Sequence, residues 1–284
     1  MKMSEKPFIT IITSTYNAQE TIERCLVSVE SQSFSRLEHI IVDGGSVDGT
    51  VECIRAHAQG KDSRVSWWIS EPDGGIYNAW NKALPHINGE WVQFLGADDY
   101  LHAPDTMELV SQILEETPAE IDVAYGKVAL FSKDGEIRAW YGNPWNETKH
   151  SFFHGKCLPH QGVFQRSQTF FEQKGFDEQF RVLGDYDMLL RVLKKDEVLF
   201  MDLPVTMMQM GGISSNPAWT VTAGYETYQA LQKNGYGSFA HYLKYYLKFR
   251  GIEIMYNYFP KFTVYIRNMV RKWNGDDLIP SYQS

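Results

Sequence analysis

Short apolar runs alternate with amphipathic patterns over the first hundred residues. The runs are rich in β-branched residues and lie at 8–13, 39–42, 65–69 and 91–95. Between the first two runs, Ile22, Leu26 and Val29 recur at helical spacing, and further helices are predicted to begin at Asp48 and Ile76. Strands that alternate with helices are typical of βαβ units, so the pattern predicts an α/β fold with a mainly parallel sheet.

The pattern changes after Pro104. A predicted helix over 105–116 precedes two predicted strands at 122–131 and 136–141, which are joined at Lys133-Asp134-Gly135 as in a β-hairpin. We expect this second half to be α+β and to complete the acceptor side of a cleft.

Composition narrows the class of protein. The chain has 284 residues, 43% of them apolar, which is enough for one large α/β domain, alone or with an appendage. The formal net charge of -8 argues against a nonspecific nucleic-acid binder, which needs a positive field. The cysteines Cys25, Cys53 and Cys157 show no metal-type spacing such as C-x-x-C. They predict a reduced, cytosolic chain in which Cys25 and Cys53 are small core residues.

Hydropathy predicts neither a signal peptide nor a membrane span. Residues 1–6 are polar and charged, and the apolar run after them is short and rich in threonine. No window holds about 18 consecutive apolar residues. The expected location is the cytoplasm, with any membrane contact peripheral, at the inner face of the membrane.

Polar residues follow the predicted strands. Ligands bind beyond the carboxyl ends of the strands in an open α/β sheet, so these residues are expected to share one edge. They are Thr15, Asn17, Asp43, Ser46, Glu71, Asp73, Asp98 and Asp99.

Six short motifs follow one another along the chain. They are Ser14-Thr15-Tyr16-Asn17, VDGGSVDGT at 42–50, EPDGGIYNAWNK at 71–82, FLGADD at 94–99, His160-Gln161 and GDYD at 184–187. Six motifs in the right order rarely arise by chance. In these motifs the stretch from Phe8 to Ser215 resembles the family 2 glycosyltransferases of the GT-A fold. The E-P-D-x-G-I-Y variant resembles bacterial enzymes that assemble exopolysaccharide, capsule or O-antigen units.

The resemblance implies a Rossmann-like mixed sheet flanked by helices, with a site for a nucleotide-sugar donor. The donor-binding residues that it implies are Thr15, Asn17, Asp43, Asp73, Gly74, Asn81, Lys82 and Asp98. Alternatives remain for some of them. Asn17 can simply cap its helix, Asp43 and Asp48 can form an Asx-turn and a helix cap, and Lys82 can be a solvated helix lysine.

Asp98 and Asp99 are the predicted metal ligands. Adjacent carboxylates repel each other unless a cation compensates, and hard divalent cations prefer oxygen ligands, so Mn²⁺ or Mg²⁺ bridging to the diphosphate is expected. The chain departs from the family at Gly96, where many members carry a further acid that contacts the ribose. The alternative is a solvated acidic turn before Tyr100.

Asp185 stands where the family places its general base, just before a helical run. The resemblance implies that it takes the proton from the acceptor hydroxyl. Gly184 replaces the acidic residue that usually precedes this base. Asp187 is the alternative base, and we favour Asp185 for that role and Asp187 for capping or orienting the helix.

The predicted function is therefore that of an inverting hexosyl- or N-acetylhexosaminyl-transferase. It is expected to move a sugar from a nucleoside diphosphate, expected to be UDP, to a glycan or lipid-linked saccharide in bacterial surface polysaccharide synthesis. The alternative is a GT-A domain that binds a nucleotide sugar or glycan without turnover. An NAD-dependent oxidoreductase is disfavoured, because no G-x-G-x-x-G follows the first predicted strand.

The predicted domains are a catalytic domain over 1–220 and a helical extension over 221–284. The catalytic domain divides into a nucleotide-sugar half over 1–103 and an acceptor half over 104–220. The extension interleaves aromatic residues with lysine and arginine, a composition suited to an anionic membrane interface. Packing on the catalytic domain and a dimer contact are equal alternatives.

Overall fold

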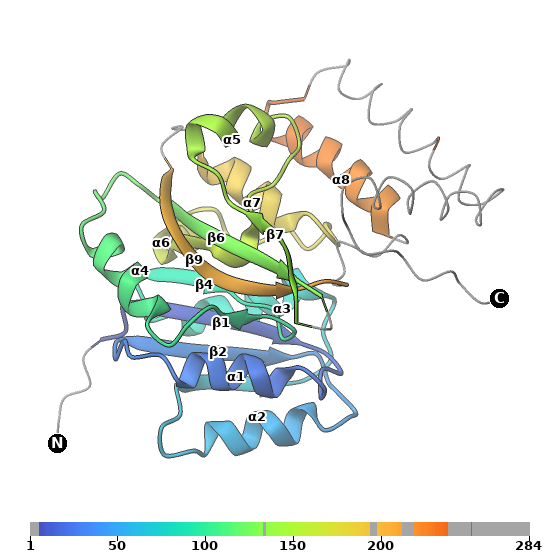
Figure 1. Cartoon of the computed structure of the whole chain (residues 1–284). Coiled ribbons are helices and arrows are strands. Elements are labelled where there is room, and N and C mark those ends of the chain that lie inside the picture. Colours follow the sequence, from blue (N-terminus) through green and yellow to red (C-terminus); the bar gives the residue numbers. More distant parts are fainter. Residues whose placement is uncertain (1–5, 133–134, 194–197, 212–218, 238–250, 252–284) are drawn as a thin grey trace.

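The computed structural model describes residues 6–132, 135–193, 198–211, 219–237 and 251 (Figure 1). The first half alternates strands and helices as predicted. Its elements are β1 (Ile9–Thr15), α1 (Ile22–Glu30), β2 (Leu37–Asp43), α2 (Thr50–Ala58), β3 (Val65–Ser70), α3 (Ile76–Ala83), the 3₁₀ turn η1 (Leu84–His86) and β4 (Trp91–Phe94).

The second half contains the predicted helix after Pro104 and the predicted hairpin. Its elements are β5 (Tyr100–Leu101), α4 (Thr106–Glu115), β6 (Val123–Phe131), β7 (Ile137–Tyr141), α5 (Trp145–Phe152), the 3₁₀ turn η2 (His160–Gly162), β8 (Val163–Arg166), α6 (Ser167–Glu172), α7 (Gly184–Val192), β9 (Leu199–Gln209) and α8 (Thr220–Lys233).

The strands of the described residues form one nine-stranded mixed sheet in the order β3-β2-β1-β4-β8-β6-β9-β5, with β7 paired to β6. Strands β1 to β4 are mutually parallel, whereas β8 runs antiparallel to both β4 and β6. The predicted α/β fold with its mixed sheet is therefore confirmed. The parallel half brings the carboxyl ends of β1, β2 and β4 to a common edge.

Helices cover both faces of the sheet, and this explains why its central strands are apolar throughout. Neighbouring residues of β1 point to opposite faces: Ile12 packs with Trp80 and Leu189 of α3 and α7, and Ile11 packs with the apolar residues of α1 and α4. Figure 1 shows α1 and α2 together below the sheet and α7 with α8 above it. Every residue of β2 is buried accordingly.

Three local predictions need correction. Asn17 does not cap α1, which begins at Ile22 with Thr21 in the N-cap position, and Asn17 instead adopts a left-handed φ of 48° in the loop before the helix. Cys25 is fully buried as predicted, but Cys53 is only partly buried, because it lies at the outer side of the contact between α1 and α2. The helix predicted from Asp48 begins at Thr50, whose backbone N–H donates to Asp48 Oδ1 at 2.9 Å.

The beginning of the predicted extension packs on the catalytic domain. Helix α8 starts at Thr220 and lies beside α7, and Ala230 and Leu231 join the core on that face (Figure 1). The aromatic and basic residues that suggested a membrane contact lie mainly outside the described residues. Within the described part of the chain, no helix combines the length and the apolar character that crossing a bilayer requires.

Candidate functional site

The loops that follow β1 and β2 are joined at the carboxyl edge of the sheet. Thr15 and Asp43, the last residues of these strands, are register partners. The backbone N–H of Asn17 donates to Ser46 Oγ at 2.7 Å, and Asn17 Oδ1 accepts the N–H of Val47 at 3.0 Å. Asn17 therefore holds the two loops together and remains exposed to solvent.

Asp43 organises the second loop from a fully buried position. Its Oδ2 accepts hydrogen bonds from the N–H groups of Gly45 and Ser46 and from Ser70 Oγ, at 3.1, 2.9 and 2.6 Å. Its Oδ1 accepts the hydroxyl of Ser46 at 2.5 Å. Asp43 therefore forms the Asx-turn that was the alternative interpretation of the sequence. A direct contact between Asp43 and the nucleotide stays a prediction.

Asp73 and Gly74 line the same edge from the loop before α3. Asp73 Oδ1 accepts the N–H of Gly75 at 2.8 Å, while its Oδ2 lies so close to Gly44 that a Cβ there would come within 2.8 Å. The Gly74 carbonyl accepts a hydrogen bond of 2.6 Å from Arg181 Nη1. The loop is therefore tied both to the β2 loop and to the segment that precedes α7.

Lys82 supports this loop from α3, and Asn81 joins the same helix to the segment around Phe176. Lys82 Nζ lies 2.8 Å from Glu71 Oε1 and donates to the Pro72 carbonyl at 3.1 Å. Asn81 exchanges two hydrogen bonds with the backbone of Phe176, at 2.8 and 2.9 Å. These contacts give both side chains positioning roles, and their predicted contact with a donor stays a prediction.

Asp98 and Asp99 lie between β4 and β5, directly before Tyr100, and Asp99 is almost fully buried. Burial and the adjacent Asp98 carboxylate raise the pKa of Asp99 to about 8, and burial also raises the pKa of Asp98. The positive charge of Arg24 lowers the pKa of both carboxylates but does not offset the burial, so both pKa values stay raised. The oxygen ligands and the shared negative charge therefore fit a hard divalent cation.

Arg24 lies beside this pair, and the sequence did not single it out. Its Nη2 donates to the Asp98 carbonyl at 2.6 Å and to Gln209 Oε1 at 2.9 Å. Its guanidinium lies over the rings of Tyr100 and Phe131, at 4.7 and 5.0 Å from their centroids. Gln209 completes the arrangement, because its backbone N–H donates to Asp99 Oδ1 at 2.9 Å.

Asp185 lies in the first turn of α7, with 15% of its side chain exposed. The Tyr77 hydroxyl donates to Asp185 Oδ1 at 3.2 Å. The other oxygen, Oδ2, lies 4.0 Å from Cys157 Sγ and 3.7 Å from His160 Nδ1. Tyr77 thus holds one oxygen of the carboxylate, while the other oxygen lies beside the Cys157 thiol and the His160 ring.

The groups around Asp185 are neutral near pH 7. Burial and the Asp185 charge raise the pKa of both Tyr77 and Cys157 well above their usual values, so these groups remain protonated. Burial lowers the pKa of His160, whose ring stacks on Trp80 with 5.1 Å between the centroids. No positive charge on these three side chains competes for the Asp185 carboxylate.

Asp187 occupies a different environment from Asp185. Its side chain is fully buried, and Oδ2 lies 3.0 Å from Arg191 Nε and 3.2 Å from Lys233 Nζ. Asn234 Nδ2 donates to Oδ1 at 3.0 Å. This carboxylate joins α7 to α8 and is already neutralised, so the geometry gives it a packing role.

A comparison with protein families decides the class of this site. Residues 10–179 match the model described as "Glycosyl transferase family 2". The chain belongs to glycosyl transferase family 2. It is an enzyme of the transferase class, as the motif series implied.

Individual relatives agree with the family. An uncharacterised glycosyltransferase of Mycobacterium tuberculosis is 31% identical over 192 residues, which are 66% of this chain and 70% of the relative. A PGL/p-HBAD biosynthesis glycosyltransferase of Mycobacterium bovis is 28% identical over 212 residues, which are 74% of this chain and 80% of the relative.

Solved structures share the GT-A fold of this glycosyltransferase. TarS of S. aureus, solved in complex with UDP, gives a TM-score of 0.62 at 17% identity over 89% of this chain and 73% of TarS. The mannosyltransferase PcManGT from Pyrobaculum calidifontis, solved in complex with GDP-Man and Mn²⁺, gives 0.60 at 18% identity over 81% of this chain and 64% of that one.

The structure explains the two glycines that depart from the family pattern. A Cβ at Gly96 would lie 2.6 Å from Asp99 Oδ2 and 2.9 Å from Asp98 Oδ1, so the acidic pair itself fills that space. A Cβ at Gly184 would lie 2.8 Å from the Tyr77 ring. Both glycines in this glycosyltransferase therefore let a functional side chain approach the backbone closely.

Glu226 of α8 is a site-supporting residue that sequence reasoning missed. Its buried carboxylate accepts the backbone N–H groups of Arg181, Val182 and Leu183, at 2.7, 2.8 and 2.9 Å. These residues directly precede the helix that carries Asp185. The available signal was an isolated acid in an otherwise basic, aromatic stretch.

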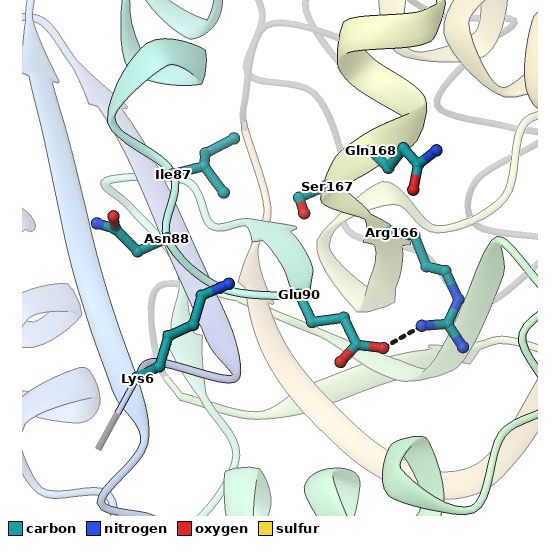
Figure 2. Close-up of a pocket in the computed structure, with 8 residues that line it drawn as sticks. Lys6, Ile87, Asn88, Glu90, Arg166, Ser167 and Gln168 are labelled. Atoms are coloured by element: carbon teal, nitrogen blue, oxygen red, sulfur yellow. Dashed lines mark hydrogen bonds and ion pairs between the residues drawn. The ribbon is translucent and has the colours of Figure 1, made fainter.

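A polar pocket lies at the opposite edge of the sheet from these groups. Figure 2 shows the ion pair between Glu90 and Arg166 on one side of it, with Lys6 and Asn88 on the other. Residues 6 and 88–90 precede β1 and β4, whereas the predicted catalytic residues follow these strands or lie on α7. The pocket is therefore separate from the candidate active site.

Proposed function

We propose that this family 2 glycosyltransferase transfers a sugar from a nucleoside diphosphate, expected to be UDP, to a hydroxyl group by a single inverting displacement. The observation that carries the proposal is the environment of Asp185, whose carboxylate is held by Tyr77 and surrounded by neutral groups. Supporting parallels are TarS, solved with UDP-GlcNAc, and PcManGT, solved with GDP-Man. The transferred group is expected to be a hexosyl or N-acetylhexosaminyl unit.

In this mechanism Asp185 is the general base. Tyr77 fixes one carboxylate oxygen by donating to it, which leaves Oδ2 to accept the proton of the acceptor hydroxyl. The neutral His160 ring and the protonated Cys157 thiol flank that oxygen without forming a strong ion pair. The acceptor oxygen gains nucleophilicity as its proton moves to Asp185.

The departing diphosphate develops negative charge in the same step. Asp98 and Asp99 are the residues that would hold Mn²⁺ or Mg²⁺, and the bound cation supplies Lewis-acid stabilisation of the diphosphate. Arg24 holds the backbone carbonyl of Asp98, and the backbone N–H of Gln209 holds the carboxylate of Asp99. Asp98 thus serves in both predicted roles, metal ligand and donor contact.

The acceptor is expected to be a glycan or a lipid-linked saccharide in bacterial surface polysaccharide synthesis. A relative of 28% identity carries the name of a PGL/p-HBAD biosynthesis glycosyltransferase, and a chondroitin synthase of Pasteurella multocida is 30% identical over 66% of this chain. A cytoplasmic enzyme at the inner face of the membrane would meet such acceptors. The competing function is donor or glycan binding without turnover.

The test measures release of nucleoside diphosphate from a panel of UDP-, GDP- and dTDP-sugars, with Mn²⁺, Mg²⁺ or chelator, in the presence of saccharide acceptors. We expect release from one donor, dependent on the metal. D185N should lower that rate about 10²- to 10⁴-fold, as expected for loss of a general base. D62N removes an exposed carboxylate at a distance from the site and serves as the matched control.

Binding measured in parallel separates the two functions. Calorimetry should show that D185N keeps the donor affinity of the wild type, because the base contacts the acceptor. A wild type that binds a donor but never releases its diphosphate supports the binding function instead. Equal rates for D185N and the wild type would remove Asp185 from the mechanism.

A further inference from the structure

A second cluster of metal-ligating side chains lies on the outer contact between α1 and α2, outside the donor and acceptor sites. Glu23 and Glu30 are two turns apart on α1, and Cys53 and His57 are one turn apart on α2. Residues at these spacings share one face of a helix. Both pairs face the contact, where the side chains of the two helices meet.

Three of these side chains converge on one point. Glu23 Oε2 lies 2.9 Å from Cys53 Sγ and 3.0 Å from His57 Nε2. The potential ligand atoms of the three residues all lie within 4.8 Å of one another. A thiol, an imidazole nitrogen and a carboxylate oxygen therefore already surround a common centre.

Glu30 orients the histidine from the other side. Its Oε2 lies 2.9 Å from His57 Nδ1, while Nε2 points toward Glu23 and Cys53. A carboxylate on the far nitrogen of a metal-binding histidine fixes the ring and raises the basicity of the ligand nitrogen. The arrangement is thus more than a surface acidic cluster, because a thiol and an imidazole lie among its carboxylates.

We propose that Cys53 Sγ, His57 Nε2 and the Glu23 carboxylate form a binding site for Zn²⁺, with Glu30 as the outer partner of His57 and a water molecule in the fourth position. Thiolate and imidazole ligands favour Zn²⁺ over Mg²⁺ and Mn²⁺, which prefer carboxylates. Binding displaces the Cys53 proton to solvent as the thiolate–zinc bond forms. The site is chemically distinct from the pair at Asp98 and Asp99.

The local geometry needs only a small adjustment to hold the ion. Tetrahedral zinc with ordinary bond lengths of about 2.0–2.3 Å separates its ligand atoms by roughly 3.5 Å. The two short contacts of Glu23 must therefore open by about half an ångström. The Glu23 side chain is 64% exposed and free to move by that amount, whereas His57, at 13%, stays fixed between the helices.

The test uses the full chain, reduced and stripped of metal with chelator, and titrates it with Co²⁺ as a spectroscopic substitute for Zn²⁺. We expect the thiolate-to-cobalt charge-transfer band and the tetrahedral d–d bands to saturate at one Co²⁺ per chain, whether or not Asp98 and Asp99 bind a further ion, and Zn²⁺ to reverse both. C53S should abolish the charge-transfer band, and H57Q should abolish tight binding. E30Q should weaken binding about 10- to 100-fold, as loss of an outer partner does.

Matched variants assign the ligands. C157S should keep the band, because Cys157 lies beside Asp185 and not in this cluster. The double variant D98N/D99N should also keep it, which separates this site from sugar transfer. Zn²⁺ should raise the melting temperature of the wild type and of both control variants, but not that of C53S.

Circular dichroism of the variants without metal shows whether they fold. A folded wild type that gives no charge-transfer band at excess Co²⁺ would overturn the proposal, as would a band that survives in folded C53S. Neither result bears on the transferase function, which is measured by diphosphate release.

Discussion

Glu226 Oε2 accepts the backbone N–H of Leu183 at 2.9 Å, so a residue of α8 fixes the start of the helix that carries Asp185. The same carboxylate binds the two preceding amides. An anionic group near the N-terminus of a helix is also favoured by the helix dipole. Helix α8 lies beyond residue 179, where the family match ends, yet it supports the predicted catalytic base.

Replacing Glu226 should therefore affect both stability and turnover. E226A leaves three backbone N–H groups without their acceptor. Each buried donor without a partner costs about 1–3 kcal/mol, but water that enters the space left by the side chain recovers part of that cost. We expect the free energy of unfolding to fall by roughly 2–4 kcal/mol. We also expect kcat to fall more than the donor KM rises, since the segment that Glu226 holds leads directly into the helix of Asp185 and reaches the predicted donor loop only through the Arg181 side chain. Denaturant melts and steady-state kinetics measure the two effects.

Y225A is the matched control for E226A, because Tyr225 is the preceding residue on the same helix and is 59% exposed. It should keep the stability and kcat of the wild type. Loss of donor affinity in E226A with an unchanged kcat would contradict a role in positioning Asp185.

D187N should destabilise the protein without acting as a base variant. Arg191, which is 14% exposed, loses its counter-charge, whereas Lys233 is 43% exposed and keeps Asp177 as a partner. Removing one partner of a buried ion pair costs about 3–5 kcal/mol, and we expect the lower end of that range. Chemical denaturation should show this loss, while diphosphate release by the folded fraction should exceed that of D185N by at least tenfold. If D187N released diphosphate more slowly than D185N, Asp187 would be the general base and Asp185 the packing residue.

Restoring a side chain at position 184 should lower activity. In G184A the new Cβ meets the Tyr77 ring at 2.8 Å and displaces the hydroxyl that donates to Asp185. We expect a fall in kcat of about tenfold, equal to roughly 1.4 kcal/mol, and a similar fall in Y77F. G251A, whose Cβ would have no neighbour within 4 Å among the described residues, is the control. Full activity in both G184A and Y77F would exclude a role for the Tyr77 contact.

His39 should make the protein less stable in acid. It is fully buried, its Nε2 lies 2.9 Å from Thr13 Oγ1, and burial lowers its pKa from 6.5 to about 3. Between these values the unfolded chain binds a proton that the folded chain excludes. The free energy of unfolding should therefore decrease as the pH is lowered from about 6.5 to about 3. In the middle of that window the contribution of His39 approaches 1.4 kcal/mol per pH unit.

Denaturant melts at several pH values in this window check the His39 prediction. H39Q removes the titrating group. Its free energy of unfolding should therefore depend less steeply on pH than that of the wild type, by the equivalent of about one bound proton, whatever its stability at pH 7. Identical slopes for the two proteins would show that His39 does not control this part of the acid response.

Local patterns in the sequence determined the fold class and the edge that carries the chemistry. The alternation of apolar strands with amphipathic helices follows from backbone periodicity, which neighbouring residues encode. The parallel β1, β2 and β4 then bring their carboxyl ends together, and the motifs after these strands identified the family. The acidic pair at Asp98 and Asp99 was recognisable for the same reason, since its two members are adjacent in sequence.

Only the tertiary structure decided how individual polar side chains are used. Asp43 and Asp185 both looked like ligand-binding acids, but Asp43 is fully buried and hydrogen-bonded to its own loop and to Ser70 of β3, whereas the Asp185 side chain stays 15% exposed. Glu226 gained its role by packing against a loop more than 40 residues away. Such contacts depend on where whole elements meet, and local periodicity does not encode that choice.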